Sequence, residues 1–338
     1  MYVRVRPLAD QGGHAARREG ENTTKQDLKR LKSFDRRKVT VTDLKTSKEQ
    51  EYNFMEQVIL PEDTQEDTFS KLGLQDLIDQ FISGYNVTFL AYGQTGTGKT
   101  HTMFGSRLDK VAEHQGVDFP KDWGIFPRAV ITAMDKMREK GGKFVFSANI
   151  IEIYFGQIYD LLNDKQAVNN NRYYSGANFD FSGVFETEVK DSGDVMRLIK
   201  VMHTYRKSRG TAMNDTSSRS HCIACLNLMR IEGEEGERKL FRSTFTFVDL
   251  SGSERLEKTG MEAKSSVASY EGLCTNWDLL HFARTIQLAR EAGKKGEKVR
   301  TVRESILARV LAKTLGGEAI TAMVITLSQS EKNGGETW

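Results

Sequence analysis

The sequence predicts an α/β fold in which helices flank a mixed β-sheet. Three observations support this. An apolar, β-branched run over residues 86–92 precedes a glycine-rich loop and a segment with helical periodicity. Strand-like and helix-like segments alternate along most of the chain. The strand-like runs 222–231 and 239–248 flank a polar tip at 232–236, which predicts an antiparallel hairpin and therefore a sheet that is not purely parallel.

The other elements follow in chain order. Residues 1–7 alternate apolar and charged side chains and predict a strand, not a signal peptide. The charge-rich stretch 12–38 predicts a surface insertion. Apolar side chains at helical spacing predict one helix over 64–83, and Asp194 predicts the cap of a helix that ends near Lys207. The remaining predictions are strands at 39–44, 144–154 and 321–327, helices at 123–140, 270–292 and 305–315, and a loop at 165–178.

Composition indicates one globular domain of 338 residues, with 38% hydrophobic and 28% charged side chains. None of the 4 prolines marks a proline-rich linker. The net charge of +3 is too small to indicate a nucleic-acid partner, and the basic residues are not interleaved with stacking aromatics. The chain has no apolar run long enough for membrane insertion.

The three cysteines, Cys222, Cys225 and Cys274, suit a reducing cytosol. Cys222 and Cys225 form a C-x-x-C pair directly after His221, so a zinc or redox site is one interpretation. The surrounding segment predicts a strand, however, in which residues three apart point to opposite faces. We therefore expect no metal or redox role for this pair.

The glycine-rich loop has the phosphate-binding pattern G-x-x-x-x-G-K-T. Its glycines allow a tight turn and bring backbone N–H groups onto phosphate oxygens. Lys99 can reach the β- and γ-phosphates, and the Thr100 hydroxyl can bind Mg²⁺. A glycine-rich turn with a chance lysine is the alternative, but it leaves the preceding strand unexplained. The loop comprises Gly93, Gln94, Thr95, Gly96, Thr97, Gly98, Lys99 and Thr100.

Two further segments carry the residue types of a nucleotide site. The strand at 239–248 leads into Asp249, an acid that can hold the Mg²⁺ shell, and Gly252 can offer its amide to a γ-phosphate. Alternatively, an aspartate in that place caps a turn or helix. The segment 214–221 contains Ser217, Ser218 and Arg219. The serine hydroxyls could bind Mg²⁺ or a phosphate, and the arginine could clamp a negative charge. Alternatively, the segment is a polar loop whose serines only hydrogen-bond the backbone.

Together these segments resemble the motor domain of the kinesin family. The residues that carry the resemblance are Asn-x-x-Ser-Ser-Arg-Ser-His at 214–221, Asp-Leu-Ser-Gly-Ser-Glu at 249–254, the loop at 93–100, and matching patterns at 4–7, 124–129, 152–162 and 314–317. The resemblance covers nearly the whole chain. It implies a P-loop NTPase with a kinesin-like motor core, as a single domain over 1–338 that ends before the neck linker and stalk.

The resemblance also implies roles for individual residues. Arg4, Pro7 and His101 would border the adenine, and Lys99 would hold the phosphates of ATP or ADP. Thr100 and Ser218 would bind Mg²⁺, with Asp249 in its outer ligand sphere. Gly252 would sense the γ-phosphate. Arg219 and Glu254 would pair when both loops close and position the attacking water, since phosphoryl transfer depends on positioning and charge neutralisation.

The chain departs from the family pattern at several positions. Ser251 stands where alanine is usual, and Phe155-Gly156 replace Asn-Glu. The pattern Ile-Asn-Lys-Ser-Leu becomes Thr-Asn-Trp-Asp-Leu at 275–279, and Ile306 replaces another lysine. A basic cluster follows the long helix and predicts a docking patch for acidic tubulin, although an ordinary charged loop has the same composition. The predicted microtubule-binding residues are Lys294, Lys295, Lys298, Arg300, Arg303 and Arg309.

The expected function is an ATP-hydrolysing microtubule motor core of the cytoplasm and cytoskeleton, which couples Mg-ATP hydrolysis to microtubule binding and movement. The alternative is a kinesin-fold microtubule-binding module with weak or no directed motility, since the filament-facing residues are altered. Cargo or stalk partners would bind through regions absent from this chain. An ATPase that acts on nucleic acid is disfavoured by the composition.

Overall fold

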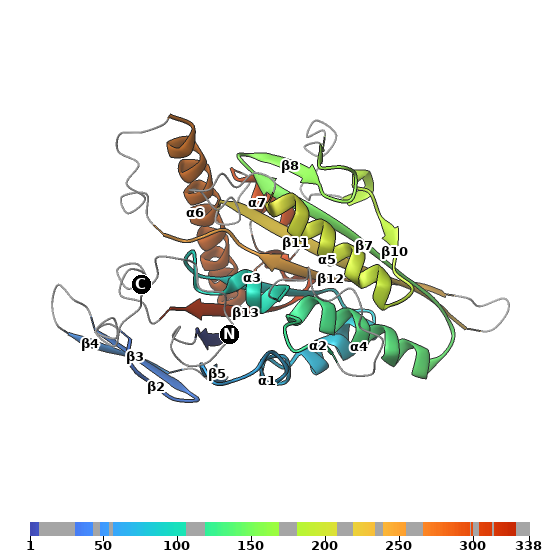
Figure 1. Ribbon diagram of the computed structural model, residues 1–338, viewed down its shortest axis with the longest axis horizontal. Helices are drawn as coiled ribbons and strands as arrows, with labels where there is room; N and C mark the ends of the chain where they lie inside the picture. Colours follow the sequence, from blue (N-terminus) through green and yellow to red (C-terminus); the bar gives the residue numbers. More distant parts are fainter. Residues whose placement is uncertain are drawn as a thin grey trace.

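The computed structural model describes residues 1–6, 31–42, 48–53, 57–105, 119–168, 181–207, 219–233, 239–254, 266–297, 299, 304–312 and 314–328. In this part of the chain, ten strands form the central sheet in the order β5-β1-β13-β6-β12-β11-β7-β8-β9, with β10 paired to β7 (Figure 1). Pairing is parallel from β5 to β12 and antiparallel from β12 onwards, which confirms the mixed sheet. The strands are β1 (Tyr2–Val5), β5 (Val58–Ile59), β6 (Val87–Tyr92), β7 (Lys143–Tyr154), β8 (Gln157–Asp160), β9 (Gln166–Ala167), β10 (Thr187–Glu188), β11 (Ser220–Glu232), β12 (Lys239–Asp249) and β13 (Ile320–Leu327).

Helices cover both faces of this sheet, and each face has its own core. The helices are α1 (Gln65–Lys71), α2 (Leu74–Ile82), α3 (Lys99–Met103), α4 (Ile125–Lys140), α5 (Ser192–Lys207), α6 (Ser266–Lys295) and α7 (Ile306–Val310). Helices α1 to α5 pack on one face with Phe89, Phe245 and Phe247, whereas α6 and α7 pack on the other with Leu90 and Val248. Successive strand residues thus alternate between the two cores, as the two-residue period of a strand requires.

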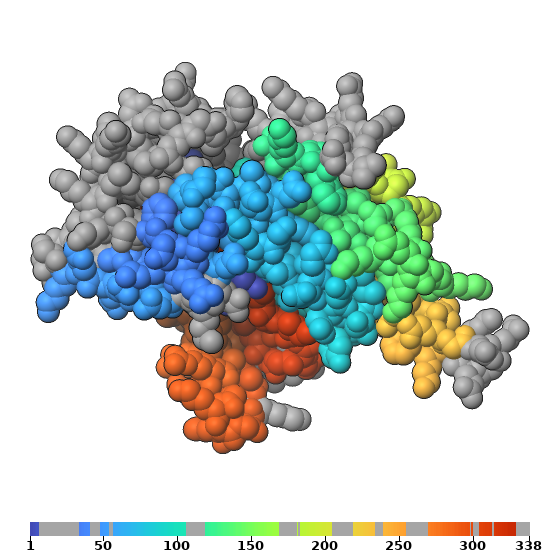
Figure 2. Space-filling view, turned by 90° about the horizontal axis from the view of Figure 1, so that it is seen from below, coloured from blue at the N-terminus to red at the C-terminus, as the bar shows by residue number. Residues whose placement is uncertain are grey.

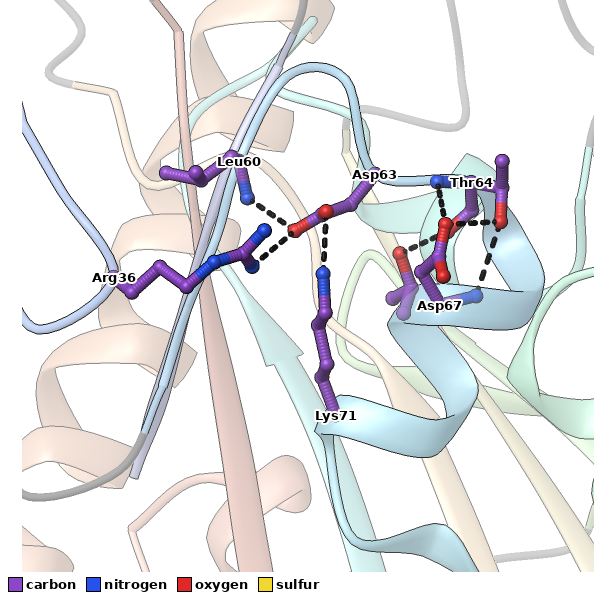
Figure 3. Close-up of polar contacts among 7 residues, drawn as sticks. Arg36, Leu60, Asp63, Thr64, Asp67 and Lys71 are labelled. Atoms are coloured by element: carbon purple, nitrogen blue, oxygen red, sulfur yellow. Dashed lines mark hydrogen bonds and ion pairs between the residues drawn. The ribbon is translucent and has the colours of Figure 1, made fainter.

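A smaller sheet of β2 (Leu31–Phe34), β3 (Lys38–Thr42) and β4 (Glu49–Asn53) lies beside the edge of the central one. Val39 of β3 packs against Val3, Val58 and Leu327. Asp63 strengthens this junction. Its carboxylate accepts the Leu60 amide at 2.8 Å and pairs with the charged groups of Lys71 at 2.5 Å and Arg36 at 3.5 Å (Figure 3).

The prediction of a single helix over 64–83 is wrong in one respect, because the segment forms two helices. Gly73 adopts a left-handed conformation at φ 67° between α1 and α2, and only glycine does so without cost. The apolar spacing continues across this break, so the pattern does not reveal it. The first helix begins with a capping box, in which Thr64 and Asp67 bond each other's backbone N–H (Figure 3).

Other helix ends also differ from prediction. Asp194 lies inside the first turn of α5, whereas Asp191 immediately precedes the helix and its carboxylate accepts the Asp194 amide at 3.0 Å. Asp194 reciprocates by accepting the amides of Lys190 and Asp191. The helix predicted over 305–315 ends at Val310, and a π-helical turn, Thr314–Glu318, follows the undescribed residue 313. In the described part of the chain, no helix is long and apolar enough to cross a membrane.

Candidate functional site

The phosphate-binding loop joins the end of β6 to the start of α3, as its sequence predicts. Three of its glycines have positive φ: Gly93 at 152°, Gly96 at 81° and Gly98 at 98°. A Cβ atom at Gly93 would lie 2.5 Å from the carbonyl oxygen of Thr326 on β13, so this position requires glycine sterically as well. The loop therefore curls closely over the carboxyl ends of the parallel strands.

Lys99 is buried inside this curl. Its ammonium group donates to the carbonyl oxygens of Gly93 and Gln94, each at 2.7 Å. A buried ammonium needs such partners to offset its lost hydration. The positive charge is thus held within the loop, next to the backbone N–H groups that would meet a phosphate.

The Thr100 hydroxyl donates to the carboxylate of Asp249 over 2.7 Å. The two residues are far apart in sequence, but β12 lies parallel to β6, and Asp249 is in register with Ala91 at the end of that strand. Hydroxyl and carboxylate oxygens are the donor atoms that Mg²⁺ prefers, so the pair fits the predicted magnesium site. Ser217 and Ser218, the other predicted hydroxyl groups, lie outside the described residues.

The loop after β12 closes on the phosphate loop through Glu254. The Glu254 carboxylate accepts the backbone N–H of Thr95 at 2.8 Å and is hydrogen-bonded to the Thr95 hydroxyl as well. Gly252 lies beneath this contact, where a Cβ atom would overlap both the Glu254 carboxylate and the Thr95 hydroxyl. The structure therefore brings Gly252 and Glu254 to the phosphate loop, and their predicted roles toward a γ-phosphate stay predictions.

The predicted pairing of Arg219 with Glu254 is not the arrangement observed. Arg219 instead binds Glu271 of α6 at 2.5 Å, with both side chains 14% exposed, and Tyr154 hydrogen-bonds the other oxygen of Glu271. Sequence reasoning missed Glu271, because nothing in the pattern of α6 shows which of its residues faces Arg219. Pairing upon loop closure stays a prediction.

Arg4 and His101 lie next to each other on the predicted adenine side. Arg4 donates to Gln65 at 2.8 Å and Thr102 at 2.9 Å, while the Gln65 amide nitrogen contacts the His101 ring at 3.1 Å. Burial lowers the pKa of Arg4 to about 10, so it remains charged. Burial of the ring among its neighbours and the charges of Arg4 and Arg6 lower the pKa of His101 to about 4, although His101 as a whole is exposed to solvent.

The His101 imidazole is therefore neutral near pH 7, which suits contact with an uncharged base. Gln65, which bridges Arg4 and His101, was not predicted from sequence. Its place at the first position of α1, directly after the Thr64 cap, is the signal that could have suggested it. Pro7, the third predicted adenine residue, lies outside the described residues.

The predicted microtubule-binding residues are described only in part. Lys294 and Lys295 are exposed at the end of α6, and Figure 2 shows an orange part of this helix as a lobe that projects from the body of the molecule. Arg309 is half-buried on α7. Lys298, Arg300 and Arg303 lie outside the described residues, so the predicted basic cluster stays a prediction.

The outer face of α6 also carries a row of apolar side chains. Tyr270, Leu273, Trp277 and Leu280 are each more than half exposed, and their spacing of three and four residues aligns them along one face. The structure thus shows an apolar surface on the helix that also carries Lys294 and Lys295.

The cysteine pair behaves as its strand pattern predicted. Cys222 packs into the core beneath α1 to α5, whereas Cys225 packs into the core beneath α6 and α7. Burial raises the pKa of Cys225 to about 12, which keeps the thiol protonated and unreactive. Within the described ranges, no cluster of three or more His, Cys, Asp or Glu side chains could hold a metal ion.

Comparison with known proteins matches residues 4–338 to the kinesin motor domain family. Kinesin-like protein Klp61F of Drosophila melanogaster is 31% identical over 346 residues, which cover 100% of this chain and 30% of that protein. Chromosome-associated kinesin KIF4 of Xenopus laevis is 33% identical over 282 residues, which cover 82% of this chain and 22% of that protein. The chain thus spans less than a third of the length of these two relatives.

Solved structures show the same likeness. A KIF14 dimer in the two-heads-bound state, with AMP-PNP and in complex with a microtubule, superposes with a TM-score of 0.77 and 26% identity. The superposition covers 99% of this chain and 89% of that one. The arrangement of sheet, helices and phosphate loop is therefore that of known motor structures.

Proposed function

The chain belongs to the kinesin family of motor domains, and on this premise we propose that it is an ATP-hydrolysing microtubule motor core, which couples Mg-ATP hydrolysis to microtubule binding and movement. One observation carries the proposal. The 2.7 Å contact between Thr100 and Asp249 joins the end of the phosphate loop to the end of β12, and so unites the two segments that hold Mg²⁺ in P-loop enzymes. We also propose that residues 1–338 form a single motor domain.

Each nucleotide-site residue has a distinct task in this proposal. Lys99 and the loop amides would bind the β- and γ-phosphates, while Thr100 and Ser218 would hold Mg²⁺ with Asp249 in the outer ligand sphere. Mg²⁺ would supply charge neutralisation on the phosphate oxygens. Ser217 would contact a phosphate, and the Gly252 amide would bind the γ-phosphate when it is present. Arg219 would pair with Glu254 when the loops close, and this pair would position the attacking water.

The proposed partner is the microtubule, and the proposed location is the cytoskeleton in the cytoplasm. The likeness to a KIF14 structure in complex with a microtubule supports this partner. Lys294 and Lys295, exposed in the last turn of α6, provide positive charge for an acidic filament. Cargo and stalk partners would bind elsewhere in a longer protein.

A second candidate is a microtubule-binding module with weak or no directed motility. The apolar row on α6 favours it, because Trp277 takes the place of a lysine in the family pattern and lies more than half exposed. An apolar contact lacks the salt-sensitive, rapidly reversible attraction of exposed charges. Such a contact would hold the chain on the filament for longer.

Two measurements on one protein preparation separate the candidates. ATP turnover with and without polymerised tubulin tests the enzyme, and microtubule gliding over immobilised protein tests movement. A motor core requires microtubule-stimulated turnover together with gliding. Microtubule binding without stimulation or gliding would favour the binding module, and a lack of Mg-dependent ATP binding would contradict the nucleotide site itself.

A further inference from the structure

Two departures from the family pattern, Ser251 and Asp278, lie beside one buried histidine. His221 is the second residue of β11 and is 1% exposed. Ser251 directly precedes Gly252 in the loop after β12, and Asp278 lies in α6. Both are buried as well. Buried polar groups in proteins are hydrogen-bonded, so the contacts among these three residues define the junction between loop and helix.

His221 contacts Ser251 through both of its ring nitrogens. The Ser251 backbone N–H donates to Nδ1 over 3.1 Å, and the Ser251 hydroxyl oxygen lies 3.3 Å from Nε2. A backbone amide can only donate, so Nδ1 must carry a lone pair and the ring proton must reside on Nε2. The imidazole is therefore neutral in this arrangement, and its N–H points to the side of the ring where Asp278 lies.

Asp278 approaches Nε2 of His221 to 3.9 Å. This distance is too long for a hydrogen bond, but a carboxylate there attracts a proton to the nearer ring nitrogen. Asp278 is held in place by hydrogen bonds from the Ser305 side chain and the Leu307 amide at the start of α7. Cys274 of α6 is a titratable neighbour of Asp278, and its pKa is raised by burial and by the charge of Asp278.

We propose that His221 and Asp278 are positioning residues for the Gly252 amide in ATP hydrolysis, an inference that rests on the proposed function. Asp278 favours the Nε2–H tautomer of His221. This tautomer leaves Nδ1 to hold the Ser251 amide, and Ser251 carries the peptide bond whose N–H belongs to Gly252. A hydrogen-bond donor that stabilises developing charge must be positioned to within a fraction of an ångström. If Ser251 lost its bond to His221, the adjoining Gly252 amide would be misplaced.

The same contacts connect the nucleotide site to α6. Asp278 is buried in this helix, and Lys294 and Lys295 are exposed at its end.

Kinetics of substituted proteins tests the positioning role. His221→Leu removes the acceptor for the Ser251 amide, whereas His221→Asn offers an amide oxygen near the place of Nδ1. We expect the leucine variant to lower microtubule-stimulated kcat about tenfold, the effect of one lost buried hydrogen bond, while affinity for a fluorescent ADP analogue changes less than about threefold. The asparagine variant should recover most of the rate, and Asp278→Asn should lower kcat by a smaller factor.

Asp160→Asn is the matched control. Asp160 of β8 is also a buried carboxylate with a pKa raised by burial, and it accepts the Leu162 and Phe185 amides away from the phosphate loop. This variant should keep the wild-type kcat. A leucine variant with wild-type kcat, or an asparagine variant no better than leucine, would overturn the inference and leave the proposed function intact. An inactive wild-type protein would instead refute the proposed function.

Histidine nitrogen NMR tests the tautomer without reference to turnover. In wild-type protein labelled at histidine nitrogens, the resonances absent from His221→Asn belong to His221. We expect Nε2 protonated and Nδ1 unprotonated near neutral pH, and a shift towards the other tautomer in Asp278→Asn. A charged imidazolium or an Nδ1–H tautomer in the wild-type protein would overturn the proposal.

Discussion

The Glu254 carboxylate accepts the backbone N–H of Thr95 over 2.8 Å, so an acidic side chain from the loop after β12 occupies an amide of the phosphate-binding loop. A phosphate oxygen is the same kind of acceptor as a carboxylate oxygen. Glu254 and a bound nucleotide would therefore compete for Thr95. Pairing of Glu254 with Arg219 would require both residues to leave their present partners, Thr95 and Glu271.

Glu254→Ala should keep nucleotide binding and lose hydrolysis. The substitution removes a competitor from the Thr95 amide, so affinity for Mg-ATP should stay equal or rise modestly. Turnover should fall by at least about tenfold, because in the proposed mechanism the carboxylate acts mainly near the transition state. Equilibrium binding and steady-state ATP turnover measure the two effects. Glu188→Ala, an exposed glutamate of β10, is the control, and unchanged turnover in Glu254→Ala would remove this residue from the mechanism.

Lys99→Ala should abolish nucleotide binding or turnover. The ammonium group lies inside the phosphate loop, where it would meet the β- and γ-phosphates of a bound nucleotide. Titration with a fluorescent ATP analogue in the presence of Mg²⁺ is the measurement. Lys136→Ala is the control, because it removes the same charge from a surface ion pair with Asp79. This variant should bind the ATP analogue with wild-type affinity. Wild-type affinity in Lys99→Ala would contradict the assignment of the loop.

Neutralising Lys294, Lys295 and Lys298 together should slow association with microtubules more than it alters basal ATP turnover. These residues lie outside the nucleotide motifs, and attraction between exposed charges mainly sets the association rate. Wild-type binding should weaken steeply with ionic strength, because salt screens such charges. Co-sedimentation with microtubules across a salt series measures both effects.

A matched triple substitution of Lys136, Lys140 and Lys143 removes the same charge from α4 and β7 and serves as the control. Binding that is insensitive to salt, or full binding by the variant at 294, 295 and 298, would point instead to an apolar contact centred on Trp277. Trp277→Ala would then be expected to weaken binding by itself.

Asp278→Asn should remove a pH-dependent part of the stability. Burial raises the pKa of Asp278 in the folded protein from 3.8 to about 6. The folded state thus binds this proton more tightly than the unfolded chain does, so the stabilisation from Asp278 is complete below about pH 4 and is lost as the pH rises through 6. The free energy of unfolding of the variant, relative to wild type, should rise by roughly 1 kcal/mol between about pH 5 and pH 7.

Urea unfolding across this pH range measures the difference. A constant difference for Asp278→Asn would show that Asp278 titrates alike in the folded and unfolded states, contrary to its burial between His221 and the start of α7.

The sequence by itself determined the parts of this protein that depend on local patterns. The phosphate loop follows from its glycines and the strand before it, and the hairpin of β11 and β12 follows from two long strand-like runs around a polar tip. The separation of Cys222 and Cys225 follows from the two-residue period of a strand. In each case the signal and the structure lie within a few residues of each other, so periodicity and turn chemistry are sufficient.

Only the tertiary structure decided which distant side chains meet. It paired Arg219 with Glu271, placed Gln65 between Arg4 and His101, and brought Ser251 and Asp278 to His221. These contacts depend on the strand order and on the rotation of α6 about its axis, which many core residues set jointly. The physical reason is that burial forces each polar group to find a partner, but packing of the whole chain selects which partner is within reach.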